Sequence, residues 1–164
     1  MSRFVDLLNP IKEFLRKKIK SYPELESQDW LQDLMFFTDV MMHLQNLNLA
    51  LQGTQKIISD LAQTVFSFQT KIKIFQRDIT SKQFDHFPNL RMRKNALPEE
   101  QILENKLNDY KSKLQDLLED FQARFEDLQE LKPCFAFLEN PFTVNVVTDG
   151  CPVPQPLATN RSTI

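Results

Sequence analysis

The stretch from Trp30 to Gly53 constrains the fold of this chain more than any other part of the sequence. Its residues recur at alternating steps of four and three, the spacing that keeps one stripe of a helix facing a partner helix. We call this set the 30–51 stripe, and it consists of Trp30, Leu34, Phe37, Met41, Leu44, Asn48 and Leu51. Two further apolar stripes run beside it: Leu31, Met35, Met42 and Leu49, then Phe36, Val40 and Leu47. A helix that is apolar over so much of its circumference is expected in the middle of a bundle, with the 30–51 stripe covered.

Three other segments carry amphipathic patterns of the same kind. With the central helix at about 28–52, the predicted helices span about residues 3–20, 55–79 and 98–131. Ser27 or Asp29 can cap the start of the central helix, and Gly53 suits its end. Residues 80–97 lose the periodicity and contain Pro88, so we predict a loop there. The expected fold is all-α, a bundle of about four long antiparallel helices.

Glycine usage supports this fold class, because a chain of 164 residues with only two glycines has little material for tight hairpin turns or phosphate-binding loops. The length suits one domain, which we place at residues 1–142. Residues 143–164 contain three prolines and no amphipathic repeat. We predict that this last part is an extended or disordered tail and that it results from a truncation.

Cysteine usage and hydropathy indicate an intracellular protein without membrane spans. Cys134 and Cys151 show no metal-binding spacing, so free thiols in a reducing compartment are expected. The first twenty residues lack a signal-peptide core, and no apolar run approaches the roughly 18 residues that a membrane span needs.

The search for catalytic residues finds none. Asp33 and Asp39 are six positions apart on the central helix and cannot share a metal, so we expect a solvated Asp33 and an exposed or salt-bridged Asp39. His43 is expected to be a half-exposed or hydrogen-bonded helix residue, and His86 a loop anchor rather than a general base. No nucleophile lies beside a base, and no phosphate-binding loop or metal set is present in the sequence. We therefore expect no enzyme activity and no cofactor.

The basic residues Arg91, Arg93 and Lys94 are candidate nucleic-acid contacts, although the predicted loop offers no aromatic platform beside them. The net charge of −2 also argues against a chain whose whole surface binds nucleic acid. Trp30 is expected in the core, and Asn48 is expected to fix the register of the packed helices. On this view, Arg93→Ala should change the melting temperature little, whereas Leu44→Asp should abolish cooperative unfolding.

Several blocks of the sequence resemble a segment shared by vertebrate proteins derived from hAT-type transposases. These relatives include the general transcription factor II-I repeat domain-containing proteins, the SCAN domain-containing and BED zinc-finger proteins, and the laforin-interacting protein. The blocks that carry the resemblance are Trp30–Val40 with His43–Gly53, His86-Phe87-Pro88, Phe121–Asp127 and Asn140-Pro141-Phe142, in that order. The resemblance as a whole covers roughly residues 1–142.

The resemblance implies that the chain is the helical insertion of an RNase H-like transposase core. None of the family's catalytic acids can be mapped onto this sequence, and neither can its N-terminal zinc finger. It therefore implies a non-catalytic scaffold or protein-interaction domain of a domesticated or truncated transposase, nuclear rather than cytoplasmic. The partner of this domain would be another protein or the remainder of a transposase core. A homo-oligomer is a further alternative. The alternative is a DNA-contacting accessory domain of an active transposase.

Overall fold

A computed structural model describes residues 5, 7–18, 22–53, 56–96 and 104–140 of the chain. All regular structure in these ranges is helical, which confirms the all-α fold class. The elements are α2 (Leu8–Lys17), the short 3-10 helix η1 (Pro23–Glu26), α3 (Gln28–Leu51), α4 (Ile58–Ser81), α5 (Pro88–Ala96), α6 (Glu104–Arg124), α7 (Glu126–Glu130) and α8 (Lys132–Glu139).

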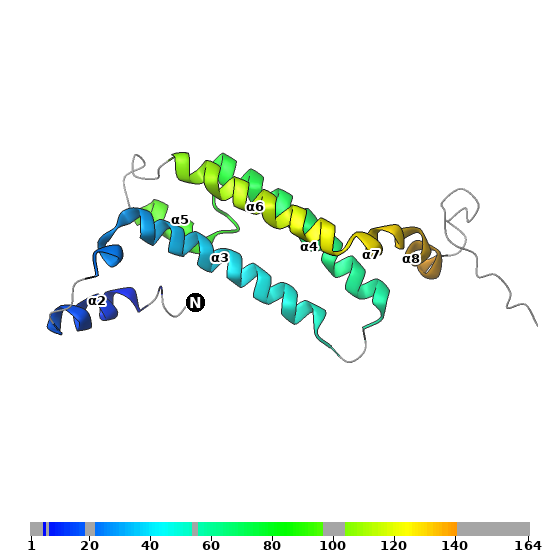
Figure 1. Ribbon diagram of the computed structural model, residues 1–164, viewed down its shortest axis with the longest axis horizontal. Coiled ribbons are helices and arrows are strands. Elements are labelled where there is room, and N and C mark those ends of the chain that lie inside the picture. The colour runs from blue at the N-terminus through cyan, green and yellow to red at the C-terminus, as the bar shows by residue number, and fades with distance from the viewer. Residues whose placement is uncertain (1–4, 6, 19–21, 54–55, 97–103, 141–164) are drawn as a thin grey trace, which may run out of the picture. The chain divides into compact units, whose positions relative to one another are not determined.

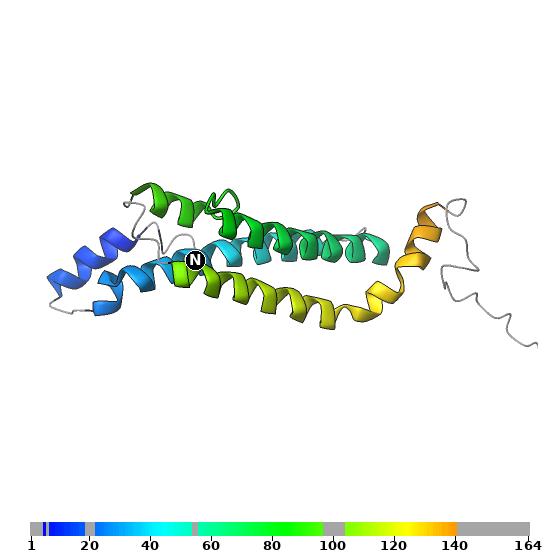
Figure 2. The same ribbon diagram turned by 90° about the horizontal axis from the view of Figure 1, so that it is seen from above.

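The chain divides into two compact units, at residues 1–121 and 122–164. In the first unit the long helices α3, α4 and α6 run alongside one another, and α5 lies against α3 (Figures 1 and 2). In the second unit α7 packs against α8. The features that bear on function lie in the first unit.

Helix α3 begins and ends where the sequence predicts. The Ser27 side chain accepts a hydrogen bond from the backbone N–H of Trp30 at 3.3 Å, which satisfies one of the free amides of the first turn. The helix ends at Leu51, and Gly53 follows with a positive φ of 147° that favours glycine. Its 24 residues make a rod of about 36 Å.

An aromatic stack holds α3 against its neighbours in the core. The ring of Phe36 lies 4.1 Å from that of Tyr110 in α6, with the two planes nearly parallel. Phe36 also stacks on Phe87, at 5.8 Å between ring centroids. Tyr110 and Phe87 are almost fully buried, so this one stack joins α3 to both α6 and the start of α5.

The structure corrects the predicted orientation of α3. Phe37, Met41 and Asn48 of the 30–51 stripe are exposed, and the other members are half-buried at the edge of the core. The buried residues come mainly from the other two stripes and from polar positions. They are Leu31, Gln32, Met35, Phe36, Thr38, Asp39 and Leu47. Met35 and Asp39 lie two positions before and after Phe37, about 200° round the axis, so α3 buries the face opposite to the one we expected.

In α4 and α6, in contrast, the regularly spaced apolar residues face the core, apart from Ile58 at the start of α4, which is 55% exposed. In α4 the buried seam runs from Val65 through Ile72 to Ile79, and in α6 it contains Leu107, Tyr110 and Leu114. Each of these helices has a polar face, so its pattern allows only one orientation. The buried faces of α4 and α6 could therefore be predicted from the sequence, whereas that of α3, which is apolar on most sides, could not.

Two predicted boundaries were wrong. The region 80–97 is not a loop throughout, because α5 begins at Pro88. The predicted helix at 98–131 is interrupted at Phe125, where the backbone leaves helical geometry. Helix α8 then begins at Lys132, and Pro133 lies in its first turn, where a missing amide hydrogen costs little.

Some predictions lie outside the described residues. These are the tail at 143–164, the start of a helix at Pro98, both ends of the helix at 3–20, and the state of Cys151. Cys134 is a free thiol, as expected. Among the described helices, none combines the length and the apolar character that crossing a bilayer requires.

The burial pattern of α4 predicts unequal costs for the same substitution at two nearby isoleucines. Ile72 is fully buried and Ile74 is 40% exposed. Ile72→Ala should lower the free energy of unfolding by roughly 2–5 kcal/mol through lost burial and a residual cavity, and Ile74→Ala by less than about 1 kcal/mol. Denaturant unfolding of both variants measures the difference. Equal losses would mean that the faces of α4 are wrongly assigned.

Candidate interaction surface

The candidate functional surface is the exposed part of the 30–51 stripe on α3. Phe37 is 47% exposed and Met41 37% exposed, although both are large apolar side chains one turn apart on the same face. Asn48 continues the stripe and is also exposed. An apolar stripe of heptad spacing that stays in contact with water is suited to packing against another helix.

Asp39 determines which face of α3 is buried. Its carboxylate is fully buried and accepts hydrogen bonds from the backbone N–H of Asn89 at 3.1 and 3.2 Å and from that of Leu90 at 3.2 Å. The side chain of Asn89 donates a further bond at 2.6 Å. Asn89 and Leu90 belong to the first turn of α5, so a residue of α3 caps α5. The expectation of an exposed or salt-bridged Asp39 was wrong.

Burial raises the pKa of Asp39 above its ordinary value of 3.8, because the charged form loses solvation. The hydrogen bonds from Asn89 and Leu90 and the nearby His43 act in the opposite direction and lower this pKa. The net shift is upward. The carboxylate is therefore held in the core by the donors at the start of α5 against a cost of desolvation.

Asp33 forms a second polar link, from α3 to α6. Its carboxylate accepts a hydrogen bond from the Tyr110 hydroxyl at 2.7 Å and pairs with the Lys106 ammonium at 2.7 Å. The bond to Asp33 raises the pKa of Lys106, and burial together with the same carboxylate raises the pKa of Tyr110. Asp33 is thus half-exposed but bound, rather than simply solvated as the sequence indicated.

A third polar cluster closes the turn between α4 and α5. Asp78 of α4 is buried and accepts the backbone N–H of Asp85 at 3.1 Å and that of His86 at 2.8 Å. Nδ1 of His86 donates to the same carboxylate at 3.1 Å, and Nε2 of His43 donates to the His86 carbonyl at 2.7 Å. Both histidines therefore hold backbone in place, as predicted for an anchor at His86 and a hydrogen-bonded His43.

This cluster brings an aspartate and a histidine together, but it carries no sign of catalysis. His86 forms hydrogen bonds with Asp78 and His43, and within the described ranges none joins it to a serine, threonine or cysteine side chain. Within those same ranges, no group of three His, Cys, Asp or Glu side chains is placed to hold a metal ion. The arrangement serves to position the turn.

The three candidate nucleic-acid residues are engaged inside the chain. Arg91 pairs with Asp85 at 3.4 Å, and the Lys94 ammonium donates to the carbonyl of Lys82 at 2.9 Å. Arg93 is only 7% exposed, and its guanidinium donates to Gln28. Burial lowers the pKa of Arg93. Nucleic-acid contact by these residues stays a prediction.

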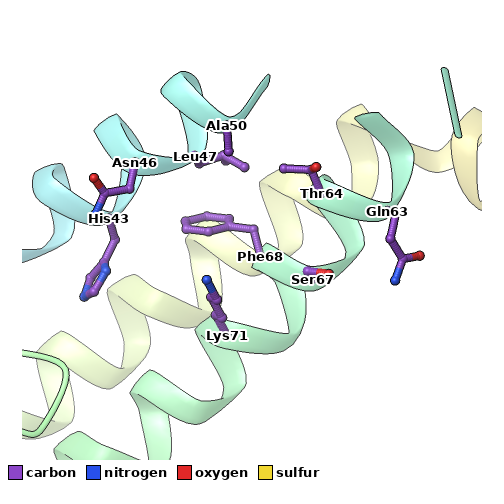
Figure 3. Close-up of a pocket in the computed structure, with 9 residues that line it drawn as sticks. All are labelled: His43, Asn46, Leu47, Ala50, Gln63, Thr64, Ser67, Phe68 and Lys71. Carbon is purple, nitrogen blue, oxygen red and sulfur yellow. The ribbon is translucent and has the colours of Figure 1, made fainter. Parts of the chain in front are cut away.

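A groove of about 280 Å³ lies between the C-terminal half of α3 and the N-terminal half of α4 (Figure 3). Its walls mix apolar and polar side chains, with Leu47 and Phe68 beside His43, Thr64 and Lys71. It shows no converging set of charged groups, so it points to no particular ligand.

Comparison with known proteins relates the chain to one helical domain. Residues 1–80 match the family model of the FAM200/GTF2IRD2 helical domain. The matched region of this FAM200/GTF2IRD2-like domain includes α2, α3 and most of α4. No solved structure matches the chain.

Two curated relatives extend the similarity beyond residue 80. General transcription factor II-I repeat domain-containing protein 2 of Bos taurus is 29% identical over 148 residues, and its counterpart of Mus musculus is 26% identical over 146 residues. Each alignment covers 89% of this chain and 15% of the relative. The chain therefore corresponds to a small part of these proteins.

The capping role of Asp39 predicts a pH effect with a definite sign. Because the folded-state pKa is raised, the native state keeps a proton that the unfolded chain releases as pH rises above 3.8. The wild-type stability relative to Asp39→Asn should therefore fall as pH rises from 3.8 through the folded-state pKa, and then level off. Denaturant unfolding of both proteins between about pH 3 and pH 8 measures this difference.

A difference that is independent of pH, or that grows with pH, would contradict the raised pKa. Asp39→Ala tests the cap separately, because alanine accepts none of the four hydrogen bonds that reach α5. It should cost about 1–3 kcal/mol, since the buried donors lose their acceptor, and this cost should fall with rising pH as it does for Asp39→Asn.

The burial of Arg93 reverses the expectation that its removal is harmless. Arg93→Ala should lower the free energy of unfolding by about 1–3 kcal/mol, because it removes the bonds to Gln28 and the packing of a buried side chain. Arg91→Ala is the matched control, since its exposed ion pair contributes less than about 0.5 kcal/mol. Thermal unfolding of the two variants distinguishes them, and equal shifts would argue against a buried Arg93.

Proposed function

We propose that this chain is a non-catalytic helical scaffold whose 30–51 stripe packs against a partner helix, and that it derives from a domesticated or truncated hAT-type transposase. The observation that carries the proposal is the exposure of Phe37 and Met41 in a stripe of heptad spacing. Contiguous apolar surface of this kind marks interaction sites in water-soluble proteins. The similarity of residues 1–80 to the FAM200/GTF2IRD2 helical domain supports the transposase-derived origin.

The polar clusters support a scaffold rather than an enzyme. Asp39, Asp78 and Asp33 each bind a neighbouring segment, and their hydrogen bonds are used to hold helices and turns in place. A rigid helix pair is a good platform for a binding stripe, because little conformational entropy is lost when a partner docks. The names of the two relatives refer to a transcription factor, which favours a nuclear location for this chain.

The alternative function, a DNA-contacting accessory domain, has less support. It needs Arg91, Arg93 and Lys94 to reach phosphate, and Arg93 is used inside the fold. Binding to duplex or hairpin DNA should therefore be absent or weak at low salt, when electrostatic contacts are strongest. Salt-dependent binding that Arg91→Ala and Lys94→Ala reduce would favour this alternative instead.

Site-specific photo-crosslinking tests the proposed interface. Benzoylphenylalanine at position 37 should form a covalent adduct with a protein in cells that produce the chain, because this position lies in the 30–51 stripe. Position 74 on α4 is the matched control, since Ile74 is 40% exposed and Phe37 47%. No adduct from position 37, or equal yields from both positions, would refute the stripe as an interface.

A further inference from the structure

We propose that the helix packed on the 30–51 stripe is the same stripe of a second copy of this chain, in a parallel and two-fold symmetric pair of α3 helices. This inference rests on the proposed function, because it names the partner of the surface proposed there. Three features of α3 carry it: the repeat, the polar residue within it, and the charges around it.

The repeat has the length and period of a short coiled coil. In heptad notation Leu34, Met41 and Asn48 occupy the a positions, and the d positions hold Trp30, Phe37, Leu44 and Leu51. The repeat runs without a break from Trp30 to Leu51, about 32 Å of α3. Its exposed members are Phe37, Met41 and Asn48, while the other four are partly buried against the core of the same chain. The part that is most exposed, at Phe37 and Met41, lies in the middle of this length, where a partner would bury it most completely.

Asn48 argues for an identical partner in parallel orientation. It is exposed in the monomer, so the fold itself does not use it to fix the packing of helices, as we had expected. Against an apolar residue of a partner its amide would be buried without a hydrogen bond, at a cost in free energy. In a parallel pair each a position faces its own copy, so the two Asn48 amides can donate to and accept from each other. In an antiparallel pair a positions face d positions, all of which are apolar here.

The charges around the stripe do not oppose such a pair. Helix α3 contains no lysine or arginine, and its 30–51 stripe contains no charged residue. Of the three acids on α3, Asp39 lies on the opposite face within the core and Asp33 is paired with Lys106. Asp29, in the first turn, is exposed and lies outside the a and d positions. The e positions along the stripe are Leu31, Thr38, Gln45 and Gln52, all of them uncharged. Leu31 and Thr38 are buried within the chain's own core, and Gln45 and Gln52 are exposed. Two copies can therefore approach without the like-charge repulsion that separates acidic helices.

Sedimentation equilibrium of the purified 164-residue chain over a wide range of concentration tests the pairing. The wild type should show a monomer–dimer equilibrium. Phe37→Glu combined with Met41→Glu should raise the dissociation constant roughly 100-fold or more, because two charges enter the apolar seam. The helical content and the unfolding transition of the monomer should stay unchanged, since both side chains are exposed. Ile74→Glu, on α4, should dimerise as the wild type does.

Disulfide trapping tests the parallel orientation. In a background with Cys134→Ser and Cys151→Ser, Leu51→Cys should form a disulfide-linked dimer, because position 51 meets its own copy only in the parallel pair. Ile74→Cys should not form one. Asn48→Leu should keep the dimer but lower the yield of the disulfide at position 51, since the residue that fixes the orientation is gone.

Three outcomes would overturn the inference: a monomer at every concentration, a dimer that the double glutamate variant leaves intact, or a dimer without the disulfide at position 51. The proposed function fails separately. If the purified chain is monomeric but position 37 crosslinks to a different protein, the interface stands and the second copy is refuted. If position 37 crosslinks to nothing, the interface itself is refuted.

Discussion

Helix α5 begins at a carboxylate that belongs to another helix, and the arrangement of the first unit depends on this contact. Phe87, which precedes α5, has no polar side chain to cap the free amides, so Asp39 of α3 does so from fifty positions earlier in the chain. The contact buries an acid, and four hydrogen bonds from three donors offset part of the lost solvation. It also fixes the rotation of α3 about its axis, because Asp39 has to point at α5.

The rotation of α3 determines the surface that the chain presents. A helix that is apolar on all sides can turn almost any face inward at similar hydrophobic gain, so its polar contacts decide the outcome. With Asp39 turned inward, the residues about 200° away are directed away from the core, and these include Phe37. The exposed stripe is therefore a consequence of the buried cap. The same geometry that completes the monomer leaves an apolar seam available for a partner.

The cluster of Asp78, His86 and His43 shows that residues common in active sites can also hold a turn in place. Asp78 and His86 form a hydrogen-bonded pair, which in an enzyme would orient a base. Here the same carboxylate also binds two backbone amides, and the second histidine binds a carbonyl, so their bonds tie the turn after α4 to α3 and α4.

By itself, the sequence determined that the chain is helical, because the apolar residues recur with helical periodicity. It also determined where α3 begins and ends, through its capping residues, and which faces of α4 and α6 are buried, through the polar face of each helix. A proline at the first position of α5 was a usable signal for that helix, but its cap is distant in sequence and could not be recognised. Only the tertiary structure decided which face of α3 is buried and that Arg93 lies inside. The physical reason is that both depend on single polar contacts between segments far apart in the chain, Asp39 with α5 and Arg93 with Gln28, and such contacts leave no periodic trace in the sequence.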